Sequence, residues 1–307
     1  MVTDVPIDLK DRDAFIAKLT DIYPDEVEQI LVRLGQADPH VSFWLNPLVN
    51  SDHTVTGDTI SGSPLQVRTD RETITRSEAA EDGAIYIQNP SSYLAVQCLN
   101  VAAGMEVLDL AAAPGGKTIA LAAIMENTGR IAAVEPVPGR FHRLRANVAR
   151  CGVTNVDFYQ RDGRTVGRAV PEGFDRVLLD APCSSEARMR WHDSSTYQHW
   201  QLRKVKETQR KQKALIMSAY QALKPGGEMI YCTCSFAPEE NELVVAHLLK
   251  RTAAELMPIA RVLPPNARQG LTRWRDKQIK GPLARTIRIT PDAIWDGFYL
   301  ARIVKPR

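Results

Sequence analysis

The sequence predicts an α/β protein, with a parallel, doubly wound sheet preceded by a small N-terminal α+β appendage. From about residue 84, short apolar runs alternate with helical patterns, which is typical of strands and helices alternating along a parallel sheet. Residues 50–83 are instead rich in Thr, Ser, Asp and Gly, which favours a separate small unit. We therefore divide the chain into an appendage of residues 1–85 and a main domain of residues 86–307.

In the appendage, residues 11–34 are expected to form two short helices, because apolar residues recur at intervals of three and four. Pro24 lies between them and is followed by acids, as in the first turn of a helix. Residues 41–45, VSFWL, are expected to form a strand that ends at Asn-Pro.

In the main domain, the expected strands are the apolar runs at 107–110, 130–135, 156–160, 175–180, 227–234 and 296–304. The expected helices lie between them, at 116–126, 139–152, in a long segment that ends at Leu223, and at 238–251.

The composition is that of a globular protein without a membrane segment or a disulfide framework. The chain has 307 residues, 44% of them apolar, which is enough for a sizeable core. Its first residues carry acids where a signal peptide has bases, and its apolar runs are too short to span a bilayer. Five cysteines are an odd number, and the Cys-x-Cys at 232–234 does not have zinc-site spacing. We expect a cytoplasmic monomer with reduced thiols and no metal.

Two stretches are strongly basic although the net charge is only +3. Residues 203–213 carry six bases and one acid, and residues 268–288 carry seven bases and one acid. Such stretches can hold the phosphates of a nucleic acid. A solvated helix face and a basic loop would show the same pattern, so composition alone does not decide.

The strand at 107–110 leads into a turn of small residues, AAAPGGK, and then a helix start. Backbone amides at such a turn can hold an anion or the polar edge of a ligand. Gly116, Lys117 and Thr118 match the end of a P-loop, but the first glycine that a P-loop requires is Ala111 here. The G-x-G-x-x-G of a dinucleotide fold is also missing. The pattern disfavours a phosphate cradle.

Two further acids lie at the ends of the next strands. Glu135 ends the second strand, where a carboxylate can accept both hydroxyls of a ribose. Asp162 follows the third strand, where it can accept from an adenine amine. Strand ends of any α/β protein often carry Asp or Glu, so each acid alone is weak evidence. The series, together with the small-residue turn, favours S-adenosyl-L-methionine as the cofactor.

Four segments in one order carry a more specific signal: LDLAAAPGGKT (108–118), DRVLLDAPCSS (175–185), LKPGGEMIYCTCSFAPEENE (223–242) and DGFYLARI (296–303). Together with YIQNPSS (86–92) they resemble the RsmB/Sun family of S-adenosylmethionine-dependent RNA cytosine-5 methyltransferases. The resemblance covers roughly residues 85–305. It implies the Rossmann-like doubly wound sheet of class I methyltransferases.

The resemblance also implies catalytic roles. Carbon 5 of cytosine is a poor nucleophile, and a thiolate that adds to carbon 6 makes the ring enamine-like. Cys234 is similar to the family's nucleophile, and Cys183 to its second cysteine, which assists proton removal or product release. Asp180 is similar to the acid at the edge of the base, a role that requires burial to raise its pKa. Lys117 is expected to hold Asp180 in place.

The resemblance implies that the cofactor is contacted by Ala111, Ala112, Ala113, Pro114, Gly115, Gly116, Lys117, Glu135, Arg140, Asp162 and Asp180. The remaining cysteines, Cys98, Cys151 and Cys232, are expected to be packed in the core. The aromatic residues after Cys183 either stack on a flipped base or pack under their own loop; they are Trp191, Tyr197 and Trp200.

Some positions depart from the family pattern. Ala111 stands where the family usually has Cys, which we expect to be harmless. Ser185 and Ala187 stand where glycines are frequent, so the loop after Cys183 and its substrate contacts are expected to differ. The C-terminal RNA-binding domain of some members has no counterpart in this sequence. RNA binding is therefore expected from residues 1–85, the basic stretches or a protein partner. Ribosomal RNA is favoured over transfer RNA, because bacterial members most often act there.

Two other functions remain open at this stage. A non-catalytic RNA-binding or ribosome-assembly factor would share the fold, although both cysteines and the cofactor acids argue against it. A methyltransferase for an exocyclic amine would carry Asn/Asp-Pro-Pro-aromatic where this chain has Asp-Ala-Pro-Cys. Cys183 alone would fit a DNA cytosine-5 enzyme, but the second site at Cys234 fits the RNA family better.

Overall fold

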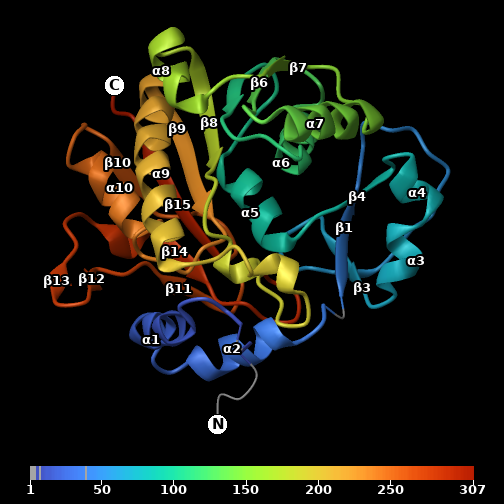
Figure 1. The fold of residues 1–307 in the computed structure, drawn as a ribbon. Coiled ribbons are helices and arrows are strands. Elements are labelled where there is room, and N and C mark those ends of the chain that lie inside the picture. Colours follow the sequence, from blue (N-terminus) through green and yellow to red (C-terminus); the bar gives the residue numbers. More distant parts are fainter. Residues whose placement is uncertain (1–4, 7, 39) are drawn as a thin grey trace.

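A nine-stranded sheet runs through the main domain in the order β11-β14-β15-β9-β8-β5-β6-β7, and β10 pairs with β15 off this path (Figure 1). The computed structural model describes residues 5–6, 8–38 and 40–307. The strands of the sheet are β5 (Glu106–Asp109), β6 (Arg130–Val134), β7 (Val156–Tyr159), β8 (Phe174–Asp180), β9 (Leu223–Thr233), β10 (Glu255–Met257), β11 (Ala267–Gln269), β14 (Ile287–Ile289) and β15 (Phe298–Val304).

The five strands from β5 to β9 pair in parallel, which confirms the predicted α/β class. The strand predicted at 296–304 is β15, and it pairs antiparallel with β9. No crossover helix leads directly into β15. It is reached instead through β10, β11, β14 and a small hairpin of β12 (Arg273–Trp274) and β13 (Lys277–Gln278).

The helices of the main domain are α5 (Pro90–Cys98), α6 (Gly116–Ile124), α7 (Pro138–Arg150), α8 (Val166–Ala169), α9 (Leu202–Ala222) and α10 (Glu242–Leu249), with short 3-10 turns at η1 (Gly163–Thr165), η2 (Glu186–Arg188), η3 (Ser194–Thr196) and η4 (Leu283–Arg285). α5, α6 and α7 pack on one face of the sheet, and α9 and α10 pack on the other (Figure 1). Because successive strand residues point to opposite faces, each strand contributes to both cores.

The last helix begins later than its sequence pattern predicts. Residues 238–241, Pro-Glu-Glu-Asn, form a turn, and α10 begins at Glu242. The side chain of Asn241 donates to the backbone carbonyl of Ser235 at 2.8 Å and so closes the turn on the end of β9. These polar residues hold the loop after Thr233 instead of extending the helix.

The appendage has two parts that pack differently. Its first part is α1 (Arg12–Ile22) and α2 (Val27–Gly35), which match the two predicted helices and share a buried core with α9 and the end of β9. Its second part is a four-stranded sheet in the order β2-β3-β1-β4, built from β1 (Val41–Leu45), β2 (Asp58–Thr59), β3 (Gln66–Arg68) and β4 (Ile85–Ile87), with the short helices α3 (Arg71–Thr75) and α4 (Glu78–Glu81). Trp44 of β1 packs against Tyr93 of α5 and so joins this sheet to the main domain.

Candidate active site

A cavity of about 890 Å³ opens at the carboxyl ends of β5, β6, β8 and β9. It brings together the sequence-predicted site residues: Ala111, Ala112, Ala113, Pro114, Gly116, Lys117, Glu135, Arg140, Asp162, Asp180, Cys183 and Cys234. Gly115 does not line the cavity. Its φ of +111° supplies the turn that starts α6, a conformation that glycine adopts without strain.

Two cysteines from separate loops meet in this cavity. Cys183 follows β8 and Cys234 follows β9, and their Sγ atoms are 3.3 Å apart. The two loops are also joined by the backbone, since the amide of Ala187 donates to the carbonyl of Cys234 at 3.0 Å. Neither cysteine is in a disulfide. Parallel neighbouring strands thus place two thiols at one sheet edge although they are 51 residues apart in sequence.

The two thiols have different acidities. The hydrogen bond from the Cys183 thiol and, to a smaller extent, the nearby Arg188 guanidinium outweigh the effect of burial and together lower the pKa of Cys234 to about 7. The same hydrogen bond and burial raise the pKa of Cys183 well above its usual value. Cys234 is therefore the thiol poised to be a thiolate at neutral pH, with Cys183 as its donor.

Alkylation of Cys234 by iodoacetamide is expected to rise through about pH 7, instead of near the ordinary thiol value of 9.0. Arg188→Leu removes a cation that stabilises the thiolate, so the rise is expected at higher pH. Peptide mass spectrometry after timed alkylation follows Cys234 separately from Cys183. Arg203→Leu, which removes a mostly exposed cation on α9, serves as the control. An unchanged pH profile in Arg188→Leu would show that Arg188 does not tune this thiol.

Asp180 is held as a carboxylate. Its Oδ2 accepts from Lys117 Nζ at 2.5 Å, as the sequence led us to expect for Lys117. Burial acts to raise the pKa of Asp180, but Lys117 and Arg188 outweigh it and the pKa lies below its usual value. The expectation that burial raises this pKa is wrong, because the sequence did not show how close the two cations come.

The three acids that end or follow β5, β6 and β7 have different surroundings. Burial raises the pKa of Asp109, at the end of β5, to about 6. Its Oδ2 accepts from Thr118 at 2.7 Å, while its buried Oδ1 has no partner among the described residues. Glu135 is buried and accepts from the amide of Val137 at 3.0 Å. Asp162 is tied to Arg164, whose hydrogen bonds lower the pKa of this aspartate.

A buried network of hydrogen bonds joins the two cysteine loops, and the sequence motifs did not predict it. Glu240 accepts from the amide of Ser184 at 3.0 Å and from the hydroxyl of Ser235 at 2.6 Å, so it ties the Cys183 loop to the Cys234 loop. Glu186 accepts from the amide of Phe236 at 3.1 Å and from Trp200 Nε1 at 3.0 Å. Glu240 lies in the Pro-Glu-Glu-Asn of segment 223–242, which carries the family resemblance, but nothing in that segment indicated its partners.

Other candidate residues turn out to be structural. Trp191, Tyr197 and Trp200 pack under their loop: the Trp191 indole donates to the carbonyl of Leu31 in α2, and Trp200 is fully buried. Cys98, Cys151 and Cys232 are buried, as expected.

The two basic stretches differ in what they offer. On α9, the exposed bases are Arg203, Lys206, Arg210 and Lys211. In the second stretch, Arg288 is buried and pairs with Glu242 at 2.5 Å, so it is not available to a ligand. Among the residues described, no group of three or more His, Cys, Asp or Glu side chains is placed to hold a metal ion. In the same residues, no helix has the length and apolar character that crossing a membrane requires.

The parallel sheet and its strand-end acids place the protein among class I methyltransferases. Sequence comparison defines the family: the chain belongs to the family described as 16S rRNA methyltransferase RsmB/F, which matches residues 96–304. The resemblance predicted from the four motif segments is thereby confirmed.

Three relatives illustrate the match. Ribosomal RNA small subunit methyltransferase F of Vibrio vulnificus is 47% identical over 168 residues, which are 54% of this chain and 35% of the relative. The tRNA (cytosine(49)-C(5))-methyltransferase of Pyrococcus abyssi is 40% identical over 226 residues, which are 73% of this chain and 71% of the relative. The crystal structure of a methyltransferase homolog from Pyrococcus horikoshii superposes with a TM-score of 0.80 at 28% identity, covering 95% of this chain and 94% of the other. The chain thus spans about a third of the length of the Vibrio relative.

Proposed function

We propose that the protein transfers a methyl group from S-adenosyl-L-methionine to carbon 5 of a cytosine in RNA, through a covalent adduct with Cys234. The observation that carries this proposal is the 3.3 Å contact between the Sγ atoms of Cys234 and Cys183 in a cavity lined by strand-end acids. The family membership and the names of the relatives support it.

The cavity fits the cofactor. Glu135 follows β6 and lines the cavity, where its carboxylate would accept ribose hydroxyls, and Oδ1 of Asp109, unpartnered among the described residues, offers a further acceptor. The turn at 111–117 would hold the polar edge of the ligand, and Asp162 the adenine amine, once Arg164 yields one of its contacts. When bound, S-adenosyl-L-methionine supplies an electrophilic methyl group.

The chain's own groups prepare the base. The thiolate of Cys234 adds to carbon 6, the carbon 5–carbon 6 double bond opens, and electron density moves to carbon 5 and the ring nitrogens. Asp180 is ionised, so it accepts a hydrogen bond from the exocyclic amine. Nitrogen 3 takes a proton from solvent, and the new N–H then donates to the same carboxylate. Lys117 fixes the direction of this carboxylate.

Cys183 assists release of the methylated base. Once carbon 5 carries the methyl group, solvent water accepts the proton from carbon 5, nitrogen 3 returns its proton to solvent, the carbon 5–carbon 6 double bond re-forms and the bond from Cys234 Sγ to carbon 6 breaks. The Cys183 thiol lies 3.3 Å from that sulfur and donates to it as it departs. Its raised pKa keeps it protonated for this role.

Replacing Cys183 by alanine is expected to trap a protein–RNA adduct, because addition to the base proceeds but release is impaired. The measurement is a denaturing gel of the protein after incubation with RNA and the methyl donor. Cys151→Ala, which changes a buried cysteine outside the cavity, is the matched control and is expected to release product normally. Full turnover without adduct in Cys183→Ala would contradict the assigned role.

The substrate RNA is proposed to be ribosomal, held by the exposed bases of α9 and by residues 1–85. Bisulfite sequencing of RNA from cells with and without the gene tests this. A cytosine protected only when the gene is present is expected in small-subunit ribosomal RNA, and one protected in transfer RNA would reverse the choice.

A further inference from the structure

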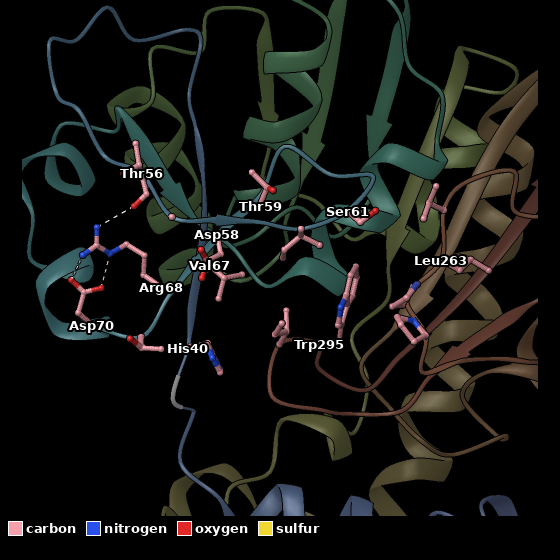
Figure 2. A pocket seen from close by; sticks show the side chains of 17 residues that line it. His40, Thr56, Asp58, Thr59, Ser61, Val67, Arg68, Asp70, Leu263 and Trp295 are labelled. Atoms are coloured by element: carbon pink, nitrogen blue, oxygen red, sulfur yellow. Dashed lines mark hydrogen bonds and ion pairs between the residues drawn. The ribbon is translucent and has the colours of Figure 1, made fainter.

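A second cavity, of about 880 Å³, lies between the small sheet of the appendage and two loops of the main domain (Figure 2). The appendage side is formed by β2, β3 and the residues next to them. The main-domain side is formed by residues 262–265 and 294–295. Figure 2 shows Trp295 on the side of the cavity away from the Arg68–Asp70 ion pair.

We propose that this cavity binds an unpaired nucleotide that flanks the target cytosine, and that it reads a base with an exocyclic amine against Trp295 and Asp58. The proposal rests on the proposed function, because it needs an RNA whose target base lies in the active-site cavity. It assigns to the appendage a direct part in choosing the RNA sequence.

Trp295 differs from the other tryptophans in its hydrogen bonding. The chain has five tryptophans, and the indole N–H of the other four donates to a carbonyl or carboxamide oxygen or to a carboxylate. The indole N–H of Trp295 has no acceptor among the described residues, the side chain is only 9% exposed, and its Nε1 is not one of the fully buried unpartnered atoms. The other four indoles all have a hydrogen-bond partner, whereas this N–H reaches open space at the cavity wall and is available to a ligand.

The opposite wall offers acceptors. Asp58 and the hydroxyls of Thr56 and Thr59 line the cavity, and none of these side chains has a hydrogen-bond partner among the described residues. An apolar floor of Val262, Leu263 and neighbouring prolines lies beside them. A flat, mostly apolar group with polar edges, such as a nucleobase, matches this combination.

A third cavity lies between this cavity and the active site. A smaller cavity of about 160 Å³ shares Gln88, Asn89 and Asp296 with the active-site cavity, and shares His40 and Ile294 with the second cavity. Trp295 and Asp296 are sequence neighbours that line the two ends of this path. The three cavities are thus neighbours, and a single strand of RNA that places one base at Cys234 is expected to pass Trp295.

The charge along this path favours a base over a row of phosphates. Arg68 pairs with Asp70 at 2.7 Å and Arg33 pairs with Asp38. Arg71, which donates to the carbonyl of His40, is therefore a single cation on this path without a carboxylate partner among the described residues. Asp58 lines the same cavity as Arg68 and has no cationic partner among the described residues, so it would repel a phosphate but accept from an exocyclic amine. Phosphate binding is better served by the exposed bases of α9.

Steady-state methylation of RNA isolated from cells that lack the gene tests the proposal. Trp295→Leu is expected to raise the KM for RNA about tenfold, the effect of losing one base–aromatic contact, with the KM for the methyl donor unchanged. Trp274→Leu is the matched control, because Trp274 is as buried as Trp295 but donates to Glu239 away from the cavity. Equal KM values for RNA in both variants would overturn the proposal.

Two further measurements separate loss of RNA binding from loss of folding and from loss of catalysis. Asp58→Asn replaces an exposed, unpaired side chain and is expected to raise the KM for RNA about threefold without changing the melting temperature. Ultraviolet cross-linking of wild-type protein to the same RNA is expected to give adducts on peptides with residues 56–61 or 293–296. Cross-links on α9 alone would overturn the inference. Cross-links in the cavity without any methyl transfer would instead count against the proposed function.

Discussion

Cys234→Ala is expected to lower the rate of RNA methylation by about 10⁴-fold or more, because without the thiolate carbon 5 of cytosine is never activated. Binding of RNA and of the methyl donor is expected to persist, since the side chain is small and contributes only one edge of the cavity. Single-turnover transfer of labelled methyl groups, with calorimetry for the methyl donor, separates the chemical step from binding.

The control for this variant is Cys151→Ala, which removes a buried thiol elsewhere in the fold and is expected to keep its activity. Retention of full activity by Cys234→Ala would contradict the assignment of the nucleophile. Calorimetry that finds no binding of S-adenosyl-L-methionine to the wild-type protein would instead favour the non-catalytic RNA-binding factor.

Glu186→Gln is expected to destabilise the protein by about 3–5 kcal/mol, the cost of leaving a buried charge without its partner. Glu186 is fully buried in η2 and pairs with Lys18 of α1, whose side chain is only 7% exposed. The same carboxylate accepts from the indole of Trp200 and from the amide of Phe236, next to the Cys234 loop. Its loss therefore weakens the contact between the appendage helices and both cysteine loops.

Denaturant unfolding measures this loss of stability, and two further variants serve as comparisons. Lys18→Met combined with Glu186→Gln removes both charges and is expected to cost less than Glu186→Gln alone. Glu207→Gln breaks an exposed pair with Arg203 on α9 and is expected to change the free energy of unfolding by no more than about 1 kcal/mol. A double variant less stable than Glu186→Gln would show that the buried pair is not the source of the effect.

The sequence predicted the part of the site that lies at strand ends. Cys183 and Cys234 each follow an apolar run directly, and parallel strands bring such positions to one edge of a sheet. The same reasoning located Glu135, and it separated Cys232, inside the strand, from Cys234 just beyond it. These predictions needed only local patterns and the order of the strands.

The residues that support the site could not be predicted in this way. Lys18 and Glu186 are 168 residues apart, and their pairing depends on how α1 packs beneath the loop after β8. The lowered pKa of Asp180 likewise depends on two cations from other elements, Lys117 and Arg188. Tertiary packing sets both features, and no periodicity along the chain reports it.

The most direct test of the account uses RNA in which cytidine is replaced by 5-fluorocytidine, which cannot lose a proton from carbon 5 after methylation. Incubation with the wild-type protein and S-adenosyl-L-methionine is expected to leave a stable protein–RNA complex, detected as an intact mass and mapped by peptide sequencing to Cys234. A complex mapped to Cys183, or methyl transfer to ordinary RNA with no complex on the fluorinated RNA, would contradict the mechanism.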